Sequence, residues 1–331
     1  MEDRKKDHID LSFQSQTPRE ALDNRFYYEP LLSAHPAGGL VPVQFLGKLF
    51  KAPLWVSSMT GGTQLAAKIN RNLATACKEF GFGMGLGSCR SILNDDLYLA
   101  DFDMRSIIGD DLPLYANLGI CQVEQLLELK QEQKIIRMVE RLRADGLIVH
   151  VNPMQEWFQP EGDVLKYPAL DTIKRLLDKV KFPLIVKEVG QGIGPESMKA
   201  LLKLPLAAIE FAAFGGTNFA KVELLRDPNA SKELFEPLSL IGTDVYQMLE
   251  SVNRIVGSDE KIACRQIIIS GGIKSFLDGH YLIKRSSIPA IYGQASSFLK
   301  YAREDYEKLQ EYVSQQIKGL EIANAFLRVK P

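Results

Sequence analysis

Short apolar runs recur along the chain at spacings that suggest repeated strands and helices. Each run holds four to six residues, and most begin or end beside Gly or Pro. Strands of a parallel sheet have this pattern because both of their faces are buried. We predict eight strands, at 53–57, 81–86, 113–116, 146–151, 183–186, 207–211, 266–269 and 289–292.

Amphipathic stretches between these runs are long enough for the crossover helices that parallel pairing requires. The clearest lie at 65–80, 123–143, 170–180 and 195–202. Two domains are an alternative at this length, but the alternation favours one α/β domain, a (βα)8 TIM barrel spanning 1–331. We expect an N-terminal extension at 1–50, an insertion after strand six at about 222–261, and one long C-terminal helix after 297.

Composition and charge narrow the classes of partner. The chain carries 40 Lys+Arg against 41 Asp+Glu, a net charge of −1, so no long-range field attracts nucleic acid. No apolar run approaches the ~18 residues of a membrane span, and no signal-peptide pattern opens the chain. Four cysteines without a CxxC pair argue against a zinc ribbon or a disulfide scaffold. We therefore expect a cytoplasmic protein with no membrane or nucleic-acid partner.

Glycines gather at the carboxyl ends of the predicted strands, where a barrel of this kind has its active site. Gly-Gly pairs stand at 61–62, 215–216 and 271–272. One such pair more often marks a tight turn, but three together favour a phosphate cradle, since glycine lets backbone N–H groups approach an anion. Lys187 ends an apolar run and would either neutralise an anionic cofactor or pair with Glu188.

The densest polar segment is HVNPMQEWFQPEGD at 150–163. His150 and Asn152 alternate inward on the predicted strand, and Gln155 follows in the loop. The carboxylates of the segment are Glu156, Glu161 and Asp163. Without a nearby thiolate or His pair, these oxygen ligands suit Mg²⁺ shared with a phosphorylated ligand, although a solvated, capped loop is the alternative.

The basic start of the chain contains Arg4, Lys5, Lys6 and His8. Such a segment either folds over the barrel mouth as a phosphate clamp or stays a solvated tail. Motifs of other chemistries are absent, since the chain has no G-x-S-x-G, no P-loop and no H-E-x-x-H.

Taken together, these motifs resemble those of the type 2 isopentenyl diphosphate isomerases, flavoproteins built on a (βα)8 barrel. The resemblance runs through MTGG, GLGSCR, NLG, the 150–163 segment, VKEVG, GGTNF and SGGIKS, and so covers nearly the whole chain. It implies interconversion of isopentenyl and dimethylallyl diphosphate without net oxidation. It also implies reduced FMN, Mg²⁺, NADPH or NADH as the reductant, and a homo-oligomer, a tetramer or an octamer.

Carried over position by position, the resemblance assigns three groups of residues. FMN would contact Ser58, Met59, Thr60, Ser88, Asn117, Lys187, Thr217, Gly271, Gly272, Lys274, Ala295 and Ser296. The small isoprenyl diphosphate substrate would contact Arg4, Lys5, His8, Arg90, His150, Asn152 and Gln155. Gln155 and His150 are the candidate catalytic residues, and Glu156 would bind Mg²⁺.

Three positions depart from the usual family pattern. Lys274 replaces an Arg, Ser296 replaces a Gly, and Ala212 stands where Ser is frequent. Lysine still binds phosphate as a point charge, so the departure affects affinity rather than the type of site.

Proton transfer to an unactivated alkene needs a strong acid, and Gln155 does not titrate. We therefore expect the reduced flavin to donate the proton, with Lys187 favouring its anionic form. An FMN-dependent oxidoreductase on the same barrel is the alternative, and a barrel that binds without catalysis is a third.

Overall fold

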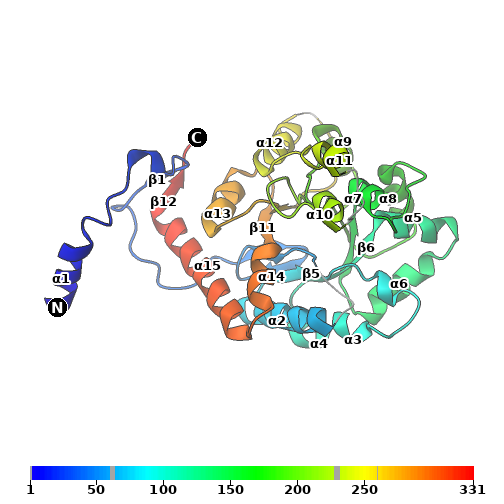
Figure 1. The fold of residues 1–331 in the computed structure, drawn as a ribbon, viewed down its shortest axis with the longest axis horizontal. Coiled ribbons are helices and arrows are strands. Elements are labelled where there is room, and N and C mark those ends of the chain that lie inside the picture. The colour runs from blue at the N-terminus through cyan, green and yellow to red at the C-terminus, as the bar shows by residue number, and fades with distance from the viewer. Residues whose placement is uncertain (1, 60–63, 227–231, 259) are drawn as a thin grey trace.

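The computed structural model describes residues 2–59, 64–226, 232–258 and 260–331. Eight parallel strands form a closed barrel in chain order, with the last strand paired to the first, and helices surround it (Figure 1). The barrel strands are β4 (Leu54–Val56), β5 (Gly83–Gly85), β6 (Leu114–Gly119), β7 (Gly146–His150), β8 (Leu184–Lys187), β9 (Ala208–Glu210), β10 (Ile267–Ser270) and β11 (Ala290–Gln294). The predicted TIM barrel is confirmed, and every predicted strand overlaps one of these.

Helices follow the strands as crossover connections and as additions. They are α1 (Glu2–Leu11), α2 (Gln64–Phe80), α3 (Leu99–Phe102), α4 (Arg105–Ile108), α5 (Ile120–Glu128), α6 (Glu132–Arg141), α7 (Pro153–Phe158), α8 (Ala169–Leu177), α9 (Pro195–Leu202), α10 (Phe219–Arg226), α11 (Lys232–Ser239), α12 (Val245–Val256), α13 (Phe276–Arg285), α14 (Ser296–Ala302) and α15 (Tyr306–Phe326). Two 3-10 turns cover Arg19–Ala21 and Arg90–Ile92.

Two helix predictions were wrong because the chain stops a helix without glycine or proline. The stretch 123–143 is not one helix but α5 and α6, separated at Lys130, which adopts φ +55°. There the Gln131 N–H bonds back to the Leu126 carbonyl at 2.7 Å, a left-handed helix stop. The C-terminal helix is likewise two helices, because Asp305 takes an extended conformation at the N-cap of α15.

The N-terminal extension pairs with distant parts of the chain. Strands β2 (Val43–Phe45) and β3 (Lys48–Phe50) form a hairpin, and β1 (Phe26–Tyr28) pairs antiparallel with β12 (Leu327–Val329) near the C-terminus. The hairpin packs under the barrel, where Phe45 and Phe50 are buried and Leu46 N–H donates to Gln266 Oε1 at 2.9 Å. It therefore closes the end of the barrel opposite the predicted site.

The stretch interpreted as an insertion, 222–261, contains the end of α10 and the whole of α11 and α12. In the structure α10 and α11 lie between β9 and α12, whereas α12 packs on β10, α9 and α13 as a crossover helix does. Its first turn is fixed by a capping box between Asp244 and Gln247. The additional material is thus best described as α10 and α11, next to the carboxyl end of β9.

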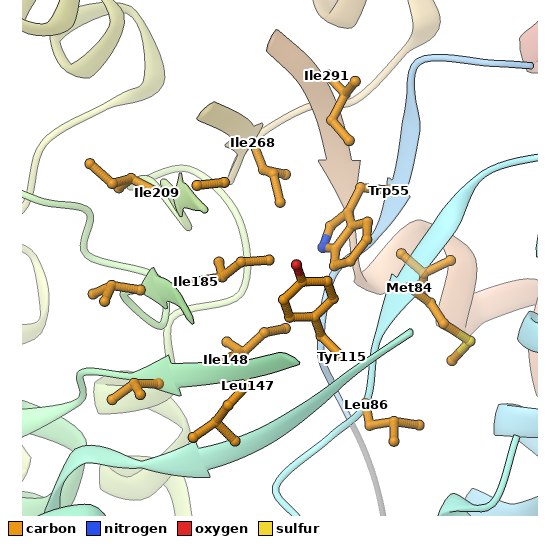
Figure 2. Packing of buried hydrophobic residues seen from close by; sticks show 14 of the residues in the cluster. Trp55, Met84, Leu86, Tyr115, Leu147, Ile148, Ile185, Ile209, Ile268 and Ile291 are labelled. Atoms are coloured by element: carbon orange, nitrogen blue, oxygen red, sulfur yellow. The ribbon is translucent and has the colours of Figure 1, made fainter. Parts of the chain in front are cut away.

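The barrel interior is filled with side chains from several strands. Trp55 and Tyr115 lie edge to face at its centre, with ring centroids 6.1 Å apart. Figure 2 shows Ile148, Ile185 and Ile268 directed toward these two rings. A packed interior leaves ligands only the rim of the barrel, at the ends of the strands. In the part of the chain that the structure describes, no helix has the length and apolar character needed to cross a membrane.

Candidate active site

A cavity opens at the carboxyl ends of β4 and β8 to β11, and eight of the predicted flavin-binding residues line it. They are Ser58, Met59, Lys187, Thr217, Gly271, Gly272, Ala295 and Ser296. Thr60 lies outside the described residues. The cavity therefore gathers residues from near both ends of the barrel sequence, from Ser57 to Ser297.

Three predicted flavin residues do not line this cavity. Asn117 is buried on β6 and donates from Nδ2 to the Leu86 carbonyl at 3.1 Å. Ser88 and Lys274 are exposed. Lys274 follows the glycine pair after β10, and its backbone N–H donates to Asp278 Oδ2 at 3.0 Å.

The glycines after β9 and β10 form a cradle that only glycine allows. Gly271 has φ +91°, and a Cβ built there would stand 2.1 Å from the Ala213 backbone nitrogen. A Cβ on Gly216 would lie 3.0 Å from the backbone nitrogen of Gly272. The two loops thus touch through their backbones, and their N–H groups remain available to an anion.

Buried polar atoms without partners mark the same region. Among the described residues, Ser57 Oγ, Ser58 Oγ and Glu210 Oε2 are buried, lack a hydrogen-bond partner and belong to side chains that line the cavity. Native structures leave few such atoms unpaired, and a polar ligand in the cavity would provide their hydrogen-bond partners. A flavin, with its ring carbonyls, hydroxyl chain and phosphate, suits them and the glycine cradle.

Lys187 is the cation of the cavity. Only 6% of its surface is exposed, and its Nζ donates to the Glu188 carbonyl at 2.8 Å. The Glu188 carboxylate is turned away and accepts from the backbone N–H groups of Gly190, Gln191 and Gly192. Burial raises the pKa of Glu188. Of the two sequence alternatives, the structure therefore favours Lys187 facing the cavity over a side-chain ion pair with Glu188.

His150 lies at the end of β7 beside Lys187, its register neighbour on β8. Burial, together with the nearby charge of Lys187, lowers the pKa of His150 to about 3. Its Nδ1 lies 2.7 Å from Asn117 Oδ1. Because Asn117 uses its amide nitrogen elsewhere, its oxygen is the acceptor, and His150 is a neutral ring that donates from Nδ1 and offers a lone pair at Nε2.

The segment after β7 begins α7, with Pro153 in its first turn. Asn152 Nδ2 donates to Gln155 Oε1 at 3.1 Å and to Glu156 Oε1 at 3.0 Å. Asn152 Oδ1 is buried and, within the described residues, has no partner. This one amide therefore fixes both following side chains and keeps an acceptor for a ligand.

Glu223 on α10 is a site residue that the sequence did not reveal. It is 3% exposed and accepts from Gln155 Nε2 at 3.0 Å, while Arg226 one turn later pairs with its other oxygen. Gln155 is thereby held between Asn152 and a buried carboxylate. A lone Glu on an amphipathic helix carries no local signal, so only the packing of α10 on α7 identifies it.

The acidic residues of the predicted metal loop do not converge. Glu156, 9% exposed, accepts from Asn152 and from the Asp163 N–H at 2.8 Å. The Asp163 carboxylate instead pairs with Arg90 at 3.0 Å, and Glu161 pairs with Arg226 at 2.9 Å. Within the described ranges, no group of three or more His, Cys, Asp or Glu side chains is placed to hold a metal ion. The role of Glu156 as a metal ligand therefore stays a prediction.

The basic N-terminal segment does not fold over the mouth of its own barrel. Arg4, Lys5 and His8 are exposed on α1. Figure 1 shows α1 beyond α15, at the opposite edge of the molecule from α7. The binding of the substrate diphosphate by Arg4, Lys5 and His8 stays a prediction.

A second cavity, about 670 Å³ in volume, lies beside the first and shares Lys187 with it. Its walls are mainly apolar side chains, including Val151, Met154 and Ile193. It is much larger, but the unpartnered polar atoms of Ser57, Ser58 and Glu210 are in the first cavity, which is the better candidate for a phosphorylated cofactor.

Sequence comparison assigns the chain to a family, although no family model matches it. The isopentenyl-diphosphate delta-isomerase of Rickettsia felis is 33% identical over 325 residues, 97% of this chain and 91% of that protein. The enzyme of Rickettsia typhi is 32% identical over 328 residues, with 97% and 92% covered. The chain belongs to the isopentenyl-diphosphate delta-isomerase family. This isomerase-family chain thus contains the hydrogen-bonded side chains of Asn152, Gln155 and Glu156.

Solved structures support the fold of this isomerase-family chain. A flavocytochrome b2 variant with pyruvate bound aligns with a TM-score of 0.63 at 12% identity, covering 91% of this chain and 72% of that one. A mandelate oxidase variant with an FMN adduct aligns with a TM-score of 0.57 at 12% identity, covering 94% and 90%. At such identities the likeness concerns the barrel alone.

Proposed function

We propose that the protein isomerises isopentenyl diphosphate to dimethylallyl diphosphate with bound FMN in its reduced state. The observation that carries this proposal is the family membership, with 33% identity to a named isomerase over 97% of the chain. The cavity adds the chemistry that FMN would need: a glycine cradle for its phosphate, a buried cation, and unpartnered polar atoms.

Lys187 would lie against the flavin ring, with the glycine cradle at the phosphate. A buried ammonium favours an anion beside it, so Lys187 would stabilise the anionic reduced ring. When bound, reduced FMN would supply the proton that the weakly basic alkene requires and would stabilise the developing cation. NADPH or NADH would keep the cofactor reduced without being consumed in each turnover.

Gln155 would face the reacting carbons, held by Asn152 on one side and Glu223 on the other. An amide does not titrate, so it orients the substrate rather than donating a proton. The Glu223 carboxylate accepts a hydrogen bond from Gln155 Nε2 and so fixes the rotamer of the amide. Positioning of this kind reduces the entropy that the reacting groups lose on reaching the transition state.

The substrate diphosphate would be held near His150, Asn152 and Arg90. The neutral ring of His150 would offer its Nε2 lone pair, and Asn152 its Oδ1, to water or hydroxyl groups around the diphosphate. Glu156 would hold Mg²⁺ jointly with the diphosphate, and the ion would neutralise its charge. Arg4, Lys5 and His8 would reach this diphosphate from a segment in another position or from a second copy in a homo-oligomer.

The test is an anaerobic assay with isopentenyl diphosphate, FMN and NADPH, with and without Mg²⁺. Dimethylallyl diphosphate should form without one NADPH being consumed per turnover. Activity should vanish with oxidised FMN and fall when Mg²⁺ is removed. A reduced or oxidised product formed with stoichiometric NADPH would contradict isomerisation and favour an FMN-dependent oxidoreductase.

A further inference from the structure

The Glu210 carboxylate, at the end of β9, is buried with one oxygen unsatisfied. The residue is 0% exposed, and its Oε1 accepts from Ser270 Oγ at 3.2 Å. In the described part of the chain, Oε2 has no hydrogen-bond partner. Leaving a buried carboxylate oxygen unpaired is costly, so the site is complete only when a donor is supplied. Glu210 and Ser270 both line the cavity, so a ligand can supply it.

The neighbouring protein groups are already committed. Ser270 Oγ accepts from the Ala212 N–H at 2.9 Å, so its own hydrogen is free to point at Glu210. Lys187 is the register partner of Glu210 on β8, yet its Nζ donates to the Glu188 carbonyl. The Lys187 ammonium and the Glu210 carboxylate therefore lie on adjacent strand ends without sharing a hydrogen bond, and both residues line the cavity.

The order of the strands places Glu210 between two anchors. β9 pairs with β8, which ends in Lys187, and with β10, which leads into Gly271 and Gly272. A flavin with its ring at Lys187 and its phosphate at the glycine cradle must carry the ribityl chain across the end of β9. The ribityl chain bears hydroxyl groups, which are donors of the kind that Glu210 Oε2 lacks.

We propose that Glu210, supported by Ser270, binds a ribityl hydroxyl of FMN. The inference rests on the proposed function, since it requires that FMN binds here. It adds a recognition element for the sugar-alcohol chain, distinct from the contacts to ring and phosphate. A hydroxyl donating to a buried carboxylate forms a charge-assisted bond, which is stronger than a neutral one.

The experiment compares three ligands in titrations of the ligand-free protein, followed by flavin fluorescence or calorimetry. FMN carries ring, ribityl chain and phosphate, riboflavin lacks the phosphate, and lumiflavin lacks the whole chain. Glu210→Leu should weaken FMN and riboflavin by about 10- to 100-fold, and lumiflavin by less than about twofold. Glu210→Gln, which keeps an acceptor oxygen but not the charge, should give an intermediate loss.

Glu124→Gln is the matched control. Glu124 is also buried, but its oxygens accept from Lys166 N–H, Tyr167 N–H and Thr172 Oγ1. This control should lower the melting temperature of the ligand-free protein and leave the FMN-to-lumiflavin affinity ratio unchanged. Glu210→Gln should leave the melting temperature of the ligand-free protein unchanged, since Glu210 Oε2 satisfies no protein donor. It should instead lower the FMN-to-lumiflavin affinity ratio.

Equal losses for all three ligands would overturn the inference, because the carboxylate would then act on the ring or on Lys187. Unchanged affinity for FMN and riboflavin in Glu210→Leu would also overturn it while leaving FMN binding intact. Failure of the unaltered protein to bind FMN would instead overturn the proposed function, and this is seen before any variant is compared.

Discussion

At the scale of single residues, the site depends on amides and carboxylates that hold one another. Asn152 directs Gln155 and Glu156, and Glu223 holds Gln155 from the opposite side. None of these contacts uses a strong acid. In the proposed function these residues position the substrate while the cofactor supplies the proton, so their loss should be visible in turnover more than in binding.

Gln155→Ala removes the amide between Asn152 and Glu223. We expect kcat to fall about 10²-fold with a much smaller rise in KM, because misplacement of reacting groups acts mainly on the transition state. Steady-state kinetics with isopentenyl diphosphate measures both. Gln315→Ala, which removes an exposed amide on α15, is the control and should leave both constants unchanged. A variant with raised KM and unaltered kcat would show that Gln155 only binds.

Glu156→Gln removes the formal charge from the proposed metal ligand. The Mg²⁺ concentration for half-maximal activity should rise about 10-fold or more, because a neutral amide is a weaker ligand for a hard cation. Glu161→Gln is the control, since Glu161 is exposed and paired with Arg226. Superimposable Mg²⁺ titrations for the Glu156 variant and the unaltered protein would exclude this ligand.

At the scale of secondary-structure elements, the strands were predictable and the interruptions were not. Buried parallel strands such as β8 begin as short apolar runs, here the three residues 184–186, and such runs are recognisable in the sequence. Lys130 ends α5 in a left-handed conformation that Lys rarely adopts, so the residue type at this position does not predict the end of the helix. The pairing of β1 with β12 joins residues about 300 apart, and nothing local specifies it.

The candidate site divides in the same way. Residues within strand-end motifs, such as Lys187 and Gly271, could be assigned from the chain because the barrel fixes where strand ends meet. Glu210 and Glu223 could not be assigned, because each is a single carboxylate. Its place in the site is defined only by its hydrogen bond to a residue of another element. The position of α1 was also not predictable, since its exposed residues carry no packing constraint.

Deleting residues 1–8 tests the element that lies apart from the barrel. The exposed residues of α1 contribute little packing, so we expect the melting temperature and the FMN content to stay unchanged. The KM for isopentenyl diphosphate should rise at least about tenfold if Arg4 and Lys5 bind the diphosphate. Kinetics identical to those of the full chain would show that the segment is a tail.

At the scale of the whole molecule, two histidines link folding to pH. Burial lowers the pKa of His150 to about 3 and that of His280 to about 4, with Lys187 and Lys284 contributing. In the unfolded chain both take up a proton near pH 6.5, whereas in the folded protein both stay neutral. The free energy of unfolding should therefore fall as pH decreases from about 6.5 to about 4.5.

Each histidine should contribute a slope of at most about 1.4 kcal/mol per pH unit, measured by urea unfolding at a series of pH values. Glu188 acts in the opposite direction, since burial raises its pKa. The double variant His150→Gln and His280→Gln should flatten the profile, and His35→Gln, at an exposed position, should not. A profile equally steep in the double variant would assign the effect to other groups.

The antiparallel pair of β1 and β12 also has a mechanical consequence. Phe26 stands opposite Val329 and Tyr28 opposite Leu327. Residues 25 and 330, which flank the two strands, therefore lie at the same end of this ribbon. A load applied between residues 25 and 330 would open the hydrogen bonds one after another, as a zipper opens, instead of shearing them together. The ribbon would yield at low force, and the barrel strands would come under tension only after α15 had been drawn away.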